Sequence, residues 1–144
     1  MKRSASKTPF HLWIVGILSL IWNAYGAFDY TATQYRIDSY MNQFTPEQLE
    51  YFYAFPAWVD AAWAVGVWGS LLGSISLLLR KRMSVFFFGA ALLGLAGTSV
   101  YSFMLNDGAS IMGDDAVTIT VVIWAIALFL YFYANAMIKR RVLG

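Results

Sequence analysis

A few polar side chains interrupt long apolar runs of this sequence, and they are its best candidates for chemistry. Asn23 lies inside the first run, Asp29 closes that run, and Asp60 lies about one helical turn into the second. Two carboxylates at matching depth can share a proton, bind a cation or contact a polar solute, and ionisable groups inside apolar helices are functional candidates by default. With their neighbours they form a predicted ligand-binding or partner-binding cluster: Asn23, Asp29, Tyr30, Arg36, Asp60 and Trp63.

Each of these polar residues also has a structural interpretation, which we prefer. A carboxylate at Asp60 is stabilised by the dipole of the helix that begins just before it. Asp29 is expected to pair with Thr33 or to reach Arg36 along the continuing helix. Asn23 is expected to bond to a hydroxyl or a backbone carbonyl on a facing helix, because an amide in an apolar environment needs a partner.

Several other kinds of site are excluded by composition. The sequence has no cysteine and a single histidine, His11, which removes thiolate chemistry, disulfides and multi-histidine metal centres. It contains no glycine-rich phosphate loop, zinc motif or Ser-His-Asp set. We therefore expect a protein that is not an enzyme and that holds no metal or cofactor. A groove for a pigment or quinone between its aromatic side chains stays open as an alternative.

The elements that must position these residues are long apolar helices. Of the 144 residues, 60% are hydrophobic and 12% are charged, whereas a soluble domain has about 25% charged residues. Four stretches are long enough to cross a bilayer at about 1.5 Å per residue: residues 10–30, 56–79, 83–105 and 116–138. The sequence predicts one all-α membrane domain over residues 1–144, folded as an antiparallel bundle of four transmembrane helices.

The charges are segregated along the chain. Basic residues precede the first stretch, join the second to the third and follow the fourth, whereas every acidic residue and Arg36 belong to the other side of the predicted bundle. The positive-inside rule then places both termini in the cytoplasm. Cleavage of the first stretch as a signal peptide near Gly26 is the alternative. We favour an uncleaved span because the apolar run is already long enough to cross.

The connections carry local signals. Residues 80–82 are too few for anything but a hairpin between the second and third helices. In the long connection of residues 29–55, Thr45, Pro46 and Gln48 form a capping box with a first-position proline. They predict a short helix from 46 to about 53 that lies in the outer headgroup layer or caps the bundle. Residues 106–115 are expected to form a loop loosened by Gly108 and Gly113.

Small residues recur every four positions on the second helix and face a similar set on the third. This spacing lets two helix backbones approach closely. It predicts packing within the hairpin, with a homodimer seam as the alternative. The packing candidates are Gly66, Gly69, Ser70, Gly73, Ser74 and Gly94.

Several short motifs give the chain a family resemblance. They are Trp22-Asn23 with Gly26, Pro56-Ala57-Trp58, Gly69 with Gly73, Leu77-Leu78-Leu79-Arg80-Lys81, and Tyr101-Ser102-Phe103. With them the chain resembles, over nearly its whole length, a family of small, uncharacterised four-helix proteins of the bacterial inner membrane, which are often labelled sugar transporters. The resemblance implies the topology and a bacterial source.

Two functions are compatible with these observations. One is a non-enzymatic accessory, structural or partner-binding protein of the bacterial inner membrane, attached to a larger membrane complex. The other is a small-solute, sugar-type carrier that acts as a homo-oligomer. The first is favoured because carriers hold substrates near the midplane with charged groups or interrupted helices, and the predicted spans are continuous. The basic clusters are membrane anchors, so the bilayer is an expected partner and nucleic acid is not.

Overall fold

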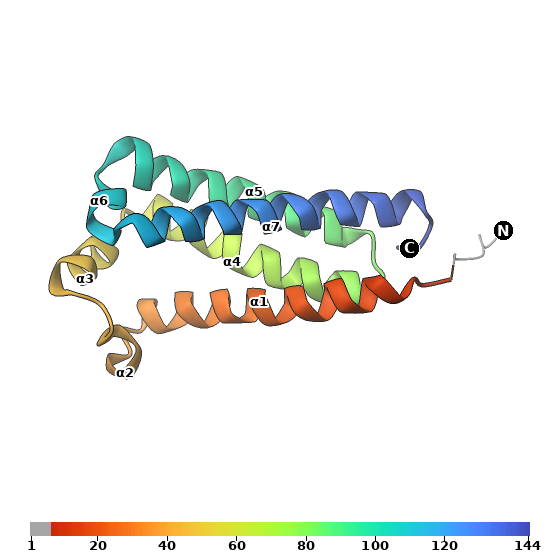
Figure 1. The fold of residues 1–144 in the computed structure, drawn as a ribbon, viewed down its shortest axis with the longest axis horizontal. Coiled ribbons are helices and arrows are strands. Elements are labelled where there is room, and N and C mark those ends of the chain that lie inside the picture. The colour runs from red at the N-terminus through yellow and green to blue at the C-terminus, as the bar shows by residue number, and fades with distance from the viewer. Residues whose placement is uncertain (1–6) are drawn as a thin grey trace.

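The computed structural model describes residues 7–144 and is helical throughout its regular elements. Four long helices run side by side, three short helices gather at one end, and the C-terminus lies at the other end, where α1 begins (Figure 1). We call these the capped end and the terminal end. The elements are α1 (Phe10–Gln34), α2 (Asp38–Met41), α3 (Pro46–Tyr53), α4 (Ala57–Leu78), α5 (Met83–Val100) with a π-helical turn η1 (Tyr101–Leu105), α6 (Gly108–Met112) and α7 (Asp114–Lys139).

The predicted fold class is confirmed. Four helices are long and apolar enough to cross a membrane, with α5 and η1 together forming the third span. Their outer surfaces carry large exposed hydrophobic side chains, among them Leu18, Val121 and Phe132. Such a continuous apolar surface is suited to lipid and not to water. The chain is therefore a multi-pass membrane protein.

Each long helix packs mainly on the long helix that precedes or follows it in the chain. α4 packs between α1 and α5, and α7 packs mainly on α5. α4 and α5 approach most closely where glycines face the opposite backbone. A Cβ added at Gly69 would lie 3.1 Å from the Phe87 carbonyl oxygen, and one at Gly94 would lie 2.5 Å from the Gly66 nitrogen. Gly73 lies against the ring of Phe88. The glycines thus line the α4–α5 crossing within one chain.

The terminal end of the bundle is closed by a compact apolar core. Leu77 on α4, Phe88 on α5 and Leu130 on α7 are fully or almost fully buried there. The chain that follows α7 folds back onto them, and its Val142 and Leu143 join the same core. Two backbone hydrogen bonds fix this tail to the α4–α5 turn, from Gly144 to the Arg80 carbonyl and from Arg82 to the Gly144 carbonyl. These contacts close the bundle at this end.

Three of the helices end in the same way. Arg36, Arg80 and Arg141 follow α1, α4 and α7 with φ between 52° and 60°, in the left-handed conformation that usually falls to glycine. In each case the next residue donates its N–H to a carbonyl five positions earlier, as Val142 does to Met137. The arginines therefore terminate helices as well as carrying charge. Lys2 and Arg3, which belong to the same predicted basic face, lie outside the described residues.

The capped end differs from the sequence prediction in three respects. α1 continues to Gln34, four residues beyond the predicted span, and α2 follows it as an additional short helix. Residues 108–112, expected as loop, form α6, which begins at Gly108. The capping-box helix forms as predicted over Pro46–Tyr53, with Thr45 and Gln48 bonded reciprocally.

Candidate functional site

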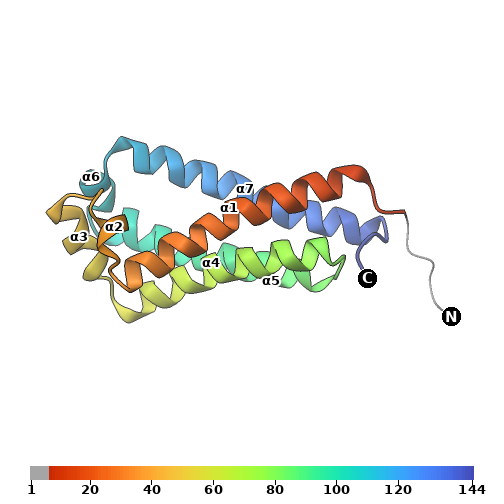
Figure 2. The same cartoon turned by 90° about the horizontal axis from the view of Figure 1, so that it is seen from below.

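A large cavity lies between the long helices near the capped end. Its volume is about 610 Å³, and its walls come from α1, α4, α5 and α7. The roof is formed by Tyr51 on α3, Phe55 in the connection between α3 and α4, and Met112 on α6. Figure 2 shows α1 and α7 diverging toward the capped end, and the cavity lies where they separate. The cavity is partly open.

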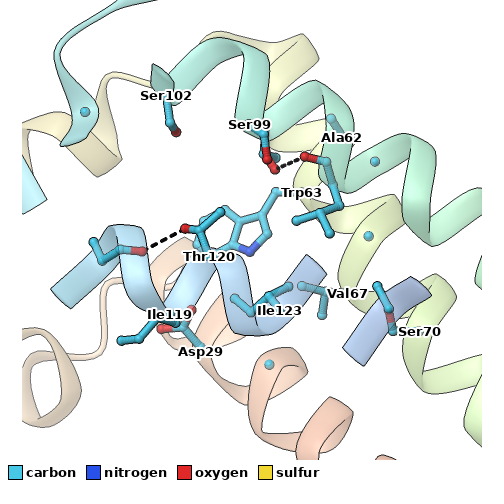
Figure 3. A pocket seen from close by; sticks show the side chains of 18 of the residues that line it. Asp29, Ala62, Trp63, Val67, Ser70, Ser99, Ser102, Ile119, Thr120 and Ile123 are labelled. Atoms are coloured by element: carbon cyan, nitrogen blue, oxygen red, sulfur yellow. Dashed lines mark hydrogen bonds between the residues drawn. The ribbon is translucent and has the colours of Figure 1, made fainter. Parts of the chain in front are cut away.

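Aromatic rings form the roof and one wall. Phe55 lies between Tyr51 and Tyr101, with ring centroids 5.2 and 5.4 Å away, and its centroid is 6.0 Å from that of Trp63. These edge-to-face contacts join α3 to α4 and to η1. Trp63 lies near the centre of the close view in Figure 3. The capping box that starts α3 therefore also sets the roof of the cavity.

One side of α1 faces the cavity along two helical turns. Trp22, Tyr25, Gly26 and Asp29 follow one another at helical spacing, and all four line the cavity. Gly26 is the gap in this row, because a Cβ added there would meet no atom within 4 Å. A glycine inside a helix costs about 1 kcal/mol relative to alanine. No neighbouring backbone requires this one, so its effect here is to widen the cavity.

A buried polar cluster ties α1 to α4 at the floor of the cavity. The Asn23 amide donates to Ser74 Oγ at 2.8 Å and to the Ser70 carbonyl at 3.0 Å. Ser74 Oγ also lies 2.9 Å from Ser19 Oγ. Asn23 thus has the hydroxyl and carbonyl partners expected from the sequence, and Ser70 and Ser74 belong to this interface.

Most hydroxyl groups in the cavity wall already have partners. Ser99 accepts from the Trp124 indole at 3.0 Å. Thr120 donates to the Ala116 carbonyl at 2.8 Å, as Figure 3 shows. Tyr51 donates to Ser102 Oγ at 3.0 Å. Burial raises the pKa of Tyr51, so this phenol keeps its proton and remains the donor. These hydroxyl groups therefore already take part in hydrogen bonds within the protein, and the rest of the wall is mainly apolar.

Asp29 is the one carboxylate among the residues that line the cavity. It accepts a hydrogen bond from the hydroxyl of Tyr40 on α2, which corrects the expectation that its carboxylate would pair with Thr33 or Arg36. The Thr33 hydroxyl instead donates to the Asp29 backbone carbonyl at 2.8 Å. Burial, together with the bond to Asp29, raises the pKa of Tyr40, so its hydroxyl remains a donor.

The other members of the predicted cluster lie apart from the cavity. The Arg36 guanidinium lies 4.0 Å from the centroid of the Tyr53 ring. Asp60 accepts from the side-chain amide of Gln34 at 3.1 Å. Tyr30 packs edge-on against Trp63, at 4.9 Å between centroids, and is not among the lining residues. The structure thus brings Asn23, Asp29 and Trp63 to one cavity and places Tyr30, Arg36 and Asp60 around it.

Replacing Asp60 with asparagine should lower the free energy of unfolding by about 1 kcal/mol or less. The carboxylate lies in the first turn of α4 and keeps one neutral partner, and an amide can replace it in that bond. Chemical unfolding in detergent measures the change, with the exposed Asp38→Asn as control. A loss of several kcal/mol for Asp60→Asn alone would show a buried ionic role.

Several cavity residues were not singled out from the sequence. Tyr51, Phe55 and Met112 reach it only because the connections fold back over the bundle. The row formed by Thr98, Ser99 and Ser102 also lines it. The sequence signal that could have predicted this row is the recurrence of hydroxyl residues on one face of the third span.

Comparison of the chain with models of known protein families, with curated proteins and with solved structures gives no match.

Proposed function

We propose that this protein is a non-enzymatic, accessory membrane protein that binds one mainly apolar, membrane-soluble molecule in the cavity. The observation that carries the proposal is the cavity itself. At about 610 Å³ it falls within the range of roughly 300–1,000 Å³ for ligand pockets. Protein interiors are otherwise close-packed, with few voids larger than a water molecule.

The lining supports binding in preference to catalysis. Aromatic and aliphatic side chains dominate it, and the hydroxyls of Ser99, Ser102 and Thr120 are engaged in internal hydrogen bonds. A general acid, a general base and a nucleophile within mutual reach are the usual signature of an active site. Asp29, bonded to Tyr40, is the single carboxylate on the wall, so binding is the simpler function. A larger membrane complex or a second copy would receive the bound molecule.

Filling the cavity from Gly26 tests this proposal. Gly26→Leu places a side chain in open space, and Gly26→Ala is the matched control with the same gain in helix propensity but little lost volume. Native mass spectrometry of protein purified in mild detergent should show a retained small molecule on the wild type and on Gly26→Ala, and its loss from Gly26→Leu. Equal occupancy of all three proteins, or none on the wild type, would contradict the proposal.

Transport of a small solute is the second candidate. The observation that favours it is asymmetry, because the cavity lies near the capped end while Leu77, Phe88 and Leu143 close the terminal end. A carrier whose site lies nearer to one side of the membrane has this shape, and alternating access would then require each end to open in turn. A sugar needs many hydrogen bonds, and the engaged hydroxyls of the wall favour an apolar substrate over a sugar. Uptake into proteoliposomes that Gly26→Leu abolishes would establish transport.

We also propose that the protein lies in the bacterial inner membrane with both termini in the cytoplasm. The support is the gathering of Lys7, residues 80–82 and residues 139–141 at the terminal end, opposite the acidic capped end. Reporter fusions after Gly144 and within the capped end at Gln43 should report opposite compartments, with the Gly144 fusion cytoplasmic. The same compartment for both would contradict the four-span topology.

A further inference from the structure

The charge distribution of the cavity narrows the class of ligand, an inference that rests on the proposed binding function. We propose that the cavity takes a lipophilic organic cation, with its positive group against Asp29 and its apolar substituents against the aromatic walls. The ligand class is a quaternary ammonium, a phosphonium or a protonated amine that carries aryl or alkyl groups.

The carboxylate of Asp29 is incompletely paired. An ionised carboxylate has about four acceptor positions, and the described residues supply its side chain with one donor, the Tyr40 hydroxyl. Within residues 7–144, no lysine, arginine or histidine lines the cavity. Arg36 is the nearest basic residue along the chain, and it is engaged on the ring of Tyr53. A carboxylate in apolar surroundings is costly unless a positive charge accompanies it, and a cationic ligand would supply that charge.

The cavity wall beside the carboxylate has space for a ligand. Gly26 lies three residues before Asp29, so on a helix it occupies the same face, one turn away. Apart from the adjacent residues and the backbone of α1 itself, no atom lies within 4 Å of a Cβ added at Gly26, so α1 is open toward the cavity one turn before the carboxylate. A group larger than a water molecule can therefore approach Asp29 from within the cavity.

The remaining surface of the cavity is mainly aromatic and aliphatic. Trp63, Tyr51 and Phe55 contribute aromatic rings to the cavity, and the faces of such rings attract organic cations. The aliphatic side chains of α5 and α7, such as Leu95, Ile119 and Ile123, supply apolar area for the substituents. A carboxylate, aromatic faces and apolar walls around one space are together complementary to a cation that partitions into membranes. An anionic lipid headgroup would meet the Asp29 charge instead.

The test uses two probes of the same shape and opposite charge. Tetraphenylphosphonium and tetraphenylborate are titrated into the full-length protein in lipid nanodiscs, with calorimetry as the readout. The wild type should bind the phosphonium and not the borate. Asp29→Asn should weaken phosphonium binding at least tenfold, whereas Asp29→Glu should stay within a few fold and the exposed Asp38→Asn should equal the wild type. Thermal melting of each variant establishes that the comparison is made between folded proteins.

The contrary results separate the two proposals. Equal phosphonium affinity in Asp29→Asn and wild type, or equal binding of the borate, would overturn the assignment of a cation. If neutral triphenylphosphine oxide then binds wild type and Asp29→Asn alike but not Gly26→Leu, the cavity remains a ligand site and only the cation assignment fails. If Gly26→Leu binds the phosphonium as the wild type does, the probe binds outside the cavity, and the proposal of a cation site in the cavity fails.

Discussion

Gly94→Leu is expected to lower the free energy of unfolding by about 3 kcal/mol or more, the largest effect of any single change considered. A Cβ at this position would lie 2.5 Å from the Gly66 nitrogen and 3.0 Å from the Gly66 Cα. These are backbone atoms, which cannot rotate aside as a flexible side chain can, so α4 and α5 must separate. Overpacking a well-packed interior already costs about 1–3 kcal/mol where side chains can adjust.

Gly26→Leu is the matched control for this prediction. It adds the same side chain to a helical glycine, at a site where nothing lies within 4 Å of the new Cβ. Unfolding in detergent micelles, followed by circular dichroism, should show a large loss for Gly94→Leu and little or no loss for Gly26→Leu. Similar melting curves for the two variants would mean that the α4–α5 crossing is looser than described.

Phe88→Ala is expected to cost about 3 kcal/mol by opening a void in the core at the terminal end. Phe88 is 2% exposed and packs in the cluster that contains Leu77 and Leu143. This cost lies at the lower end of the range for truncating a buried phenylalanine. Lipid and not water surrounds the helices before they pack, so little hydrophobic transfer free energy is lost with the ring. Lost packing therefore dominates the cost.

Phe86→Ala provides the control on the same helix. Phe86 is 70% exposed and faces outward from the bundle, so its truncation removes few protein contacts. The free energy of unfolding should fall for Phe88→Ala and change by less than about 0.5 kcal/mol for Phe86→Ala. A larger loss for Phe86→Ala than for Phe88→Ala would mean that α5 packs into the bundle through the face that carries Phe86.

The parts of the fold that depend on local signals were predictable from the sequence. The apolar runs gave the four spans, the short connection at residues 80–82 gave the hairpin, and the Thr45 capping box gave α3. Each of these features depends on residues that are close together in the chain. The hydrogen bonds of Asn23 were predictable for a similar reason, because a buried amide must find partners on whichever helix faces it.

The features that the sequence did not predict depend on contacts between distant segments. The cavity exists because α7 packs on α5 and diverges from α1 at the capped end, and no short motif encodes the separation of two helices. Tyr40 reaches Asp29 from α2, a helix of four residues that is too short to leave a periodic signal. Val142 and Leu143 follow the last basic residues, outside the predicted spans, yet they complete the core.

A crystal structure of the wild-type protein grown in a lipidic mesophase tests the central claim most directly. If the cavity binds a ligand, we expect continuous non-protein density inside it, beside Gly26 and against Trp63. We also expect α1 and α7 to be separated as in Figure 2. The aromatic roof should remain in place over that density. A structure in which α1 and α7 close together and the lining side chains fill the space would contradict the account, because no ligand site would then remain.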